Sequence, residues 1–187
     1  MSDSAKKFMS ISVWITIVLF VIRCLIDSSG IALAINQREY LNCSYSIYGY
    51  AGEAICATAI FMAVFNKWLW KKKPFYLLTG ELPVLAKHYK GTITFVWDGV
   101  EQTRNSEIWI DQTFLNVSVK LGTNESTSNS ITASIEKVNS EQKLIYTYLN
   151  TPRAELQNRS AIHYGTAMLC VDDSKKLTGN YYTSRLT

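Results

Sequence analysis

Several tyrosines, an arginine and a few small polar residues lie close together in the last third of the sequence. Aromatic rings stack on nucleobases, while the guanidinium group of an arginine pairs with phosphate oxygens through two parallel hydrogen bonds. A small number of such side chains on one wall of a pocket is therefore enough to hold a nucleotide. The candidate ligand-binding residues are Tyr146, Tyr148, Asn150, His163, Tyr181, Thr183 and Arg185.

These candidates can meet only if the strands that carry them present them on the same face. Residues 143–150 and 177–185 both alternate with a period of two, which is typical of half-buried antiparallel strands. If Leu144 and Leu177 point inward, so do the tyrosines and Arg185 further along the two strands. Each strand then has an apolar end and a polar, aromatic end, as a pocket with a sealed floor and an open mouth requires. The competing interpretation makes the tyrosines core residues whose hydroxyls reach solvent at the rim.

The alternating pattern extends over most of the chain after residue 74 and predicts seven or eight short strands. We expect an all-β domain over residues 74–187 that forms a small antiparallel barrel of about eight strands, wide enough to hold one small ligand. Trp97 points inward on an early strand and is a further stacking candidate. The strands are expected at 89–97, 107–112, 115–121, 131–136, 143–150, 163–172 and 177–185, with a short piece near 75–85.

Residues 1–73 are expected to form a transmembrane hairpin of two helices. Two apolar segments, about 8–26 and 47–70, are long enough to cross a bilayer, and the second ends in tryptophans and lysines typical of a membrane surface. Lysines lie at the start of the first segment and at the end of the second, whereas the connecting loop 27–46 has a single arginine beside a glutamate. The positive-inside rule therefore places this loop outside and the N-terminus and the following domain in the cytoplasm. Cleavage of the first segment as a signal peptide is the alternative, and it leaves the second helix in the same orientation.

Polar and small residues inside these segments are the candidates for assembly in the membrane. Arg23 and Glu53 lie at similar depths in an antiparallel hairpin, which allows a salt bridge between them. The alternative is that Arg23 reaches the outer interface and Glu53 is partly protonated. Gly49 and Gly52 lie among alanines that let helix backbones approach one another. These small residues either seal one hairpin or form the surface through which several hairpins assemble.

The distribution of charge and of reactive residues argues against several functions. The net charge of +4 lies entirely in residues 1–73, because residues 74–187 contain equal numbers of acidic and basic residues. A domain without net charge does not have the basic surface with which proteins track DNA or RNA polymers. The sequence contains two histidines and four cysteines, and it matches none of the usual catalytic or metal-binding motifs. We therefore expect no enzyme activity, no metal site and no cofactor.

Three motifs on the late strands resemble those of a known family. The segments YTYLNTP (146–152), HYGTAMLCVDD (163–173) and LTGNYYTSR (177–185), placed after a two-helix hairpin, are similar to the CD-NTase-associated protein 15 family. Members of this family are membrane effectors of bacterial CBASS antiphage defence, with two transmembrane helices and a β-barrel. The resemblance covers the whole chain in architecture and roughly residues 140–185 in motif.

The resemblance implies a bacterial inner-membrane effector whose cytoplasmic barrel binds a cyclic dinucleotide made by a partner nucleotidyltransferase. Binding would drive homo-oligomerisation and disruption of the lipid bilayer, so that the infected cell dies before phage is released. The alternatives are a membrane-anchored, lipocalin-like barrel that binds a lipid or another small apolar ligand, and a membrane toxin or anchor that needs no ligand. The residues that map onto the motif segments are Tyr146, Tyr148, Asn150, His163, Thr183 and Arg185.

Overall fold

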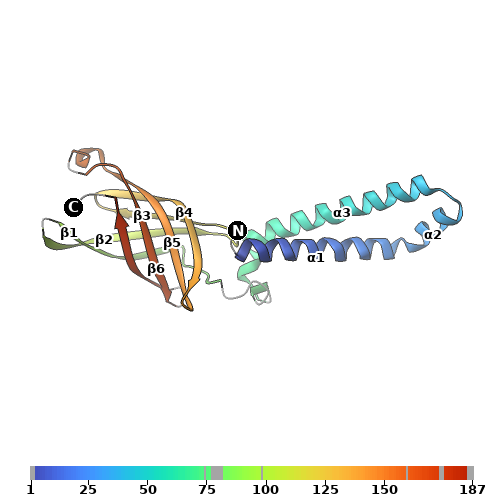
Figure 1. The fold of residues 1–187 in the computed structure, drawn as a ribbon, viewed down its shortest axis with the longest axis horizontal. Coiled ribbons are helices and arrows are strands. Elements are labelled where there is room, and N and C mark those ends of the chain that lie inside the picture. Colours follow the sequence, from blue (N-terminus) through green and yellow to red (C-terminus); the bar gives the residue numbers. More distant parts are fainter. Residues whose placement is uncertain are drawn as a thin grey trace. The chain divides into compact units, whose positions relative to one another are not determined.

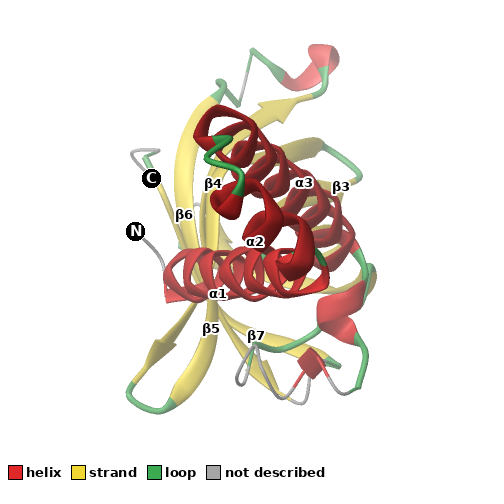
Figure 2. Cartoon of the chain, turned by 90° about the vertical axis from the view of Figure 1, so that its right-hand side faces the viewer, coloured by secondary structure: helices red, strands yellow, loops and turns green. Residues whose placement is uncertain are grey.

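The computed structural model describes residues 3–73, 75–76, 82–97, 99–158, 160–172 and 175–184. The chain divides into two compact units, Met1–Thr79 and Gly80–Thr187. Helices make up the first unit (Figure 1). A single sheet of strands makes up the second, apart from a 3-10 turn at Ala154–Leu156 (Figure 2).

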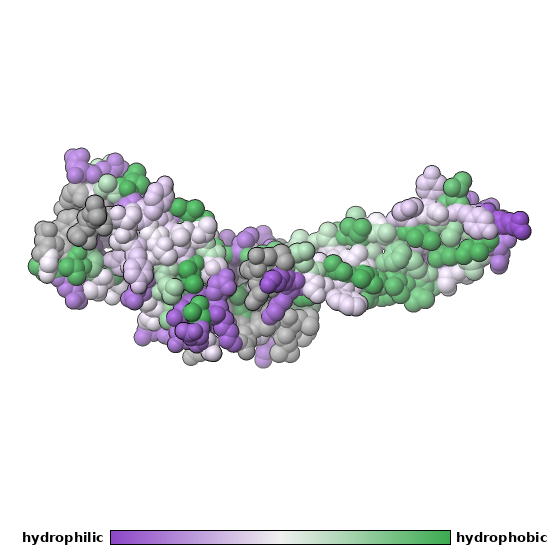
Figure 3. Space-filling model, viewed as in Figure 1, coloured by the Kyte–Doolittle hydropathy of each residue, from purple (hydrophilic) through white to green (hydrophobic). Residues whose placement is uncertain are grey.

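The first unit contains the helices α1 (Asp3–Ile26), α2 (Ser28–Asn36) and α3 (Tyr40–Lys67), followed by a 3-10 turn at Leu69–Lys71. α1 and α3 lie alongside each other in opposite directions, and α2 fills the connection that the sequence analysis expects to be a loop (Figure 1). Both long helices begin before their apolar runs, because the polar residues ahead of each run continue the helical turns. Two helical segments, Ser4–Ile26 and Tyr40–Lys67, are long and apolar enough to cross a membrane. The visible face of this unit is largely hydrophobic (Figure 3).

One face of α3 packs against α1 inside the hairpin. The buried residues of α3 recur every three or four positions, which places them on a single stripe of the helix. Across the two helices, the Thr16 hydroxyl donates a hydrogen bond to the Thr58 hydroxyl at 3.0 Å. A Cβ added at Gly49 or Gly52 would meet no described atom within 4 Å, so these glycines do not seal the hairpin. The buried stripe consists of Tyr50, Ala54, Thr58, Met62 and Phe65.

Arg23 and Glu53 form a salt bridge within the hairpin, which is the first of the two arrangements considered from the sequence. Arg23 Nε donates a hydrogen bond to Glu53 Oε2 at 2.9 Å. The Arg23 guanidinium also lies over the Tyr50 ring, with Cζ 4.1 Å from the ring centroid. The Tyr50 hydroxyl in turn donates to a carboxylate oxygen of Asp27. Because the Arg23 charge has both an anionic and an aromatic partner, the cost of placing it among apolar residues is reduced.

The second unit is one antiparallel sheet in which every strand pairs with the next along the chain. A tight turn joins the fourth and fifth strands, where Asn139 and Ser140 both have positive φ, as a two-residue hairpin turn of the primed type requires. The sheet curls into a nearly closed barrel of seven strands, close to the eight expected (Figure 1). The strands are β1 (His88–Trp97), β2 (Val100–Gln112), β3 (Val117–Thr123), β4 (Ser126–Val138), β5 (Glu141–Pro152), β6 (His163–Asp172) and β7 (Lys176–Thr183).

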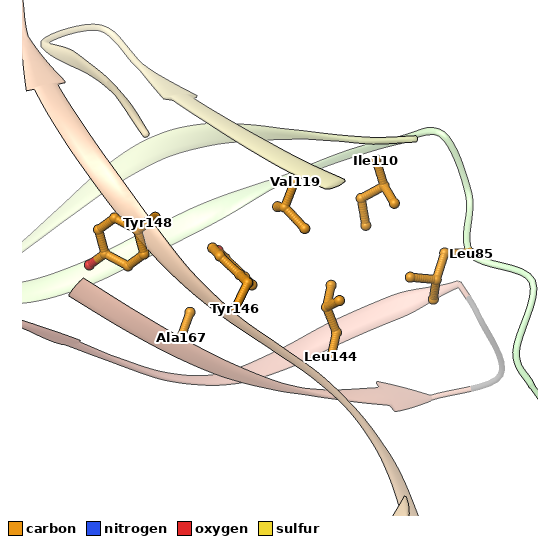
Figure 4. Close-up of a cluster of buried hydrophobic side chains, with 7 residues drawn as sticks. All are labelled: Leu85, Ile110, Val119, Leu144, Tyr146, Tyr148 and Ala167. Atoms are coloured by element: carbon orange, nitrogen blue, oxygen red, sulfur yellow. The ribbon is translucent and has the colours of Figure 1, made fainter. Parts of the chain in front are cut away.

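The short strand expected near 75–85 is not a strand where the structure describes it, and 77–81 lie outside the described residues. The Gln112 side chain accepts a hydrogen bond from the Leu85 N–H and donates one to the Pro83 carbonyl, both at 2.9 Å. These side-chain bonds replace strand pairing and direct Leu85 into the barrel. Leu85 lies at one end of the buried cluster and Tyr148 at the other (Figure 4). The cluster comprises Leu85, Ile110, Val119, Leu144, Tyr146, Tyr148 and Ala167.

Candidate functional site

The inward face of β5 changes from apolar to polar along the strand, with the phase that the sequence pattern predicts. Leu144, Tyr146, Tyr148 and Asn150 are all buried, and the residues between them are not. The two tyrosine rings are tilted by 50° and their centroids lie 5.9 Å apart. Tyr146 contributes mainly to the core, whereas Tyr148 and Asn150 lie towards the polar end of the barrel.

Tyr148 lies against Gly165 of β6, and this contact requires the absence of a side chain on β6. The strand register pairs Tyr148 with Gly165 and Gly165 with Thr183 of β7. A Cβ added at Gly165 would lie 2.3 Å from the Tyr148 Cζ and 2.5 Å from the Tyr182 carbonyl oxygen. The Tyr148 hydroxyl donates a hydrogen bond to the same carbonyl at 3.4 Å. The structure therefore brings two predicted site residues, Tyr148 and Thr183, into one row across three strands.

A second row of polar residues crosses β4, β5 and β6. Asn150 pairs in register with Ser128 on one side and with His163 on the other. The Ser128 hydroxyl donates a hydrogen bond to Asn150 Oδ1 at 2.8 Å. The amide nitrogen of Asn150 is a hydrogen-bond donor. His163 Nδ1 lies 2.9 Å from the Ala161 carbonyl oxygen, which can only accept, so in the neutral ring Nε2 is an acceptor. This row offers a donor and an acceptor suited to the polar edge of a base.

Tyr181 of β7 completes the aromatic group. It pairs in register with Ala167, which pairs with Tyr146. Burial raises the pKa of Tyr146 and of Tyr148 to about 12. Burial also raises the pKa of Tyr181, and the positive charge of Arg104 partly offsets this rise. At physiological pH these hydroxyls are therefore neutral, and they do not repel an anionic ligand.

Arg104 is an inward residue that the sequence reasoning missed. Strand β2 begins at residue 100, whereas the sequence predicts a start at 107. Because side chains alternate between the two faces of a strand, Ser106 and Arg104 lie on the same inward face as Ile108. Ser106 is buried and Arg104 is half-buried. The Arg104 Cζ lies 4.6 Å from the centroid of the Phe95 ring. Arg104 Nη1 forms a salt bridge with the carboxylate of Glu125, in the turn between β3 and β4.

Two predicted site residues are not placed with the others. Trp97 is the last residue of β1, and its backbone pairs with Val100 at the start of β2. The side chain of Trp97 and the whole of Arg185 lie outside the part of the chain that the structure describes. The stacking role of Trp97 and the phosphate-binding role of Arg185 therefore stay predictions.

A cavity of about 470 Å³ lies where β3 and β4 separate. The two strands pair only from Lys120 to Gly122, and beyond this point the Val119 N–H donates a hydrogen bond to the Ser130 hydroxyl instead. The cavity contains none of the predicted site residues. Its lining residues are Lys87, Trp109, Ile110, Asp111, Ser118, Val119, Lys120, Asn129 and Ser130.

The second unit thus combines an apolar barrel floor with an end that carries aromatic rings, amide and hydroxyl groups, and the Arg104 guanidinium. These are the groups that stack on bases, read their polar edges and pair with phosphates. The first unit has two helices long and apolar enough for a membrane. The chain is therefore of the class that joins a helical hairpin of membrane type to a small β-barrel with a candidate ligand site.

Comparison with known proteins makes this assignment specific. The family model of the Cap15 cyclic dinucleotide receptor domain matches residues 81–187, which is more than half of the chain. The chain belongs to this family, as the motifs on the late strands imply. It is 28% identical over 188 residues to CD-NTase-associated protein 15 of Staphylococcus schleiferi, an alignment that covers 100% of this chain and 94% of that protein. No solved structure matches the chain.

Proposed function

We propose that this chain is a CBASS effector that binds a cyclic dinucleotide in its barrel, oligomerises and disrupts the bacterial inner membrane. The ligand is the second messenger that a partner nucleotidyltransferase makes during phage infection. Loss of membrane integrity then kills the infected cell before phage is released. The family name of the relative and the description of the matching domain both support this proposal.

The observation that carries the proposal is the group of aromatic and polar residues at one end of the barrel. A cyclic dinucleotide has two nucleosides whose sugars are joined through two phosphates, so its receptor needs flat surfaces, base-edge partners and cations. Tyr148 and Asn150 of β5 and Arg104 of β2 offer one of each. Arg185 is proposed as a second phosphate-binding residue and Trp97 as a second stacking surface. A barrel for lipids has less support, because it would be lined by apolar side chains without an inward arginine.

The end of α3 has the composition of a membrane interface. The ammonium groups of Lys67 and Lys71 lie 5.0 Å and 5.3 Å from the ring centroids of Trp68 and Trp70, respectively. Tryptophans concentrate at both interfaces of a membrane, and lysines concentrate on its cytoplasmic side. This supports a topology in which α1 and α3 span the inner membrane, α2 lies outside, and the barrel is cytoplasmic.

Assembly of hairpins is proposed to follow ligand binding. A ligand can shift assembly only if it binds the assembled state more tightly than the resting one. Gly49, Gly52 and Ala59 are exposed on α3, away from its contact with α1, and residues of this size let a second hairpin approach closely. The Arg23–Glu53 salt bridge is satisfied within one hairpin at rest, and we propose that it exchanges partners when hairpins gather.

Permeability of the inner membrane tests this function in living cells. The full chain is expressed in a bacterial host with or without an active partner nucleotidyltransferase, and entry of propidium iodide is followed. We expect dye entry only when both are present, and no entry with the Tyr148→Ala or Arg185→Ala variants. Tyr164→Ala is the matched control, because this β6 tyrosine is 61% exposed and should not affect the response. Dye entry without the nucleotidyltransferase would instead indicate a toxin that needs no ligand.

A further inference from the structure

The guanidinium of Arg104 is a group that binds phosphates, and in this structure it forms a salt bridge with the Glu125 carboxylate of the same chain. The side chains of Arg104 and Glu125 are 37% and 33% exposed, so solvent screens their salt bridge less than a fully exposed pair. The Phe95 ring covers a face of the Arg104 guanidinium. Because the N–H donors of a guanidinium lie in its plane, a guanidinium that lies over a ring can pair with anions along its edge.

The backbone of the turn between β3 and β4 holds Glu125 in position. The Glu125 N–H donates a hydrogen bond to the Thr123 hydroxyl at 3.2 Å, and the Glu125 carbonyl accepts one from the Arg153 N–H at 2.9 Å. The Thr123 hydroxyl also accepts a hydrogen bond from the Ser126 N–H at 3.1 Å. Arg153 directly follows β5, the strand that carries Tyr148 and Asn150. A fixed backbone therefore presents the carboxylate, while rotation about the side-chain bonds can withdraw it.

The ion pair lies next to the residues of the candidate site. Ser106 and Thr123 pair across β2 and β3, which places Arg104 two residues before Ser106 on β2 and Glu125 in the turn that follows Thr123. Burial raises the pKa of Tyr181, and the positive charge of Arg104 offsets part of this rise. An anion bound among the polar residues of the barrel thus has Arg104 as a neighbouring cation.

We propose that Arg104 binds a phosphate of the ligand and that Glu125 is a built-in competitor that the phosphate must displace. This inference rests on the proposed function, because it assumes that an anionic nucleotide enters the barrel. A phosphate that approaches Arg104 meets the negative charge of Glu125, and the two anions repel each other. Glu125 therefore lowers the affinity for ligand, and the receptor responds only when the nucleotide is abundant.

Isothermal titration calorimetry on the full chain in detergent micelles tests this role. The probes are 3′,5′-linked cyclic dinucleotides that combine adenine, guanine and uracil in all pairs. For the member that the wild type binds, Glu125→Gln should lower the Kd about threefold to tenfold. Arg104→Gln should raise it at least about tenfold, since it removes charge-assisted hydrogen bonds. In the double variant, the Glu125 substitution should lower the Kd less than it does alone, because competition for Arg104 is gone and only the direct repulsion of the phosphate remains.

Two charge-matched controls separate this role from a general effect of charge. Glu101→Gln and Lys90→Gln change the net charge by the same amounts at exposed positions of β2 and β1, and both should leave the Kd unchanged. A melting curve without ligand shows that each variant is folded. If the wild type binds and Glu125→Gln does not bind more tightly, the competitor role is wrong while the proposed function stands. If neither the wild type nor Glu125→Gln binds any member, the proposed function itself fails.

Discussion

Gly165 determines where the ring of Tyr148 can lie. A methyl group at this position would come within 2.3 Å of that ring, so either the ring or strand β6 would have to move. We expect Gly165→Ala to lower the free energy of unfolding by about 1–3 kcal/mol, as overpacking does. Binding of the cyclic dinucleotide should weaken as well, because the proposed stacking surface shifts. Urea denaturation and calorimetry measure the two effects.

Gly91 in β1 offers the matched control for this substitution. A Cβ added at Gly91 meets no described atom within 4 Å. Gly91→Ala should therefore change the free energy of unfolding by no more than about 0.5 kcal/mol and leave binding intact. Equal losses from Gly91→Ala and Gly165→Ala would contradict the role given to the contact between Gly165 and Tyr148.

The buried tyrosine hydroxyls predict a loss of stability in alkaline solution. The pKa of Tyr146 and of Tyr148 is raised from 10.0 to about 12, so the folded state holds these protons more tightly than the unfolded chain. Their contribution to stability is therefore complete below about pH 10 and is lost as the pH rises towards about 12. Urea unfolding across this range should show the fall, and Tyr146→Phe should make it shallower. The exposed Tyr164 is the control, and a fall reduced equally by Tyr164→Phe would contradict this assignment.

The inward residues of β5 could be predicted from the sequence, whereas Arg104 could not. Once Leu144 is taken to be buried, the alternation of side chains along β5 determines which of its other residues point inward. The first half of β2 gives no such signal, because polar residues occupy both faces from Glu101 to Glu107. A strand that lines a polar site has polar residues where a core strand has apolar ones. The hydrophobic pattern therefore weakens where β2 reaches the site.

Among the secondary structure elements, α3 presents small residues on two faces, and only one of them contacts α1. Ala54 is 3% exposed within the hairpin, whereas Ala59 is exposed. Ala54→Leu should force the helices apart and destabilise the hairpin by about 1–3 kcal/mol. Ala59→Leu should leave the hairpin intact but reduce assembly of the ligand-bound chain. Thermal melts in detergent report on the hairpin, and chemical crosslinking in membranes reports on assembly.

The two alanine substitutions also distinguish the two uses of small residues that the sequence leaves open. Crosslinked oligomers that form normally with Ala59→Leu would remove this face of α3 from the proposed interface. Loss of the folded hairpin with Ala59→Leu would show that the face packs within one chain, contrary to the structure.

Element boundaries depended on interactions that local patterns do not contain. The strand expected near 75–85 does not form over 82–86, because the Gln112 side chain takes the place of a pairing strand. Pro83 also has no N–H to give to a sheet. Helix α2 forms in the expected loop, where the apolar run from Ile31 to Ile35 continues the helical turns. The missing strand thus depends on hydrogen bonds between residues far apart in the sequence, which the hydrophobic period does not describe.

At the scale of the whole molecule, the fold class followed from the change of hydrophobic period along the chain. Long apolar runs predict membrane helices, and alternation after residue 88 predicts a sheet with one buried face. The number of strands and the closure of the barrel are harder to predict. Within the described residues, β1 and β7 are the edges of the sheet and do not pair with each other. Closure depends on the stagger summed over all strands, which the pattern of any single strand does not encode.

Thermal stabilisation of the full chain in detergent by cyclic dinucleotides is the most direct test of the central claim, that the barrel is a receptor. The same set of adenine, guanine and uracil compounds is used. A ligand at 100 times its Kd adds about 2.7 kcal/mol to the free energy of unfolding, which raises the melting temperature measurably. We predict a rise with at least one compound, and a smaller rise in Arg104→Gln and Arg185→Ala. A folded chain whose melting temperature does not change with any of these compounds would contradict the claim.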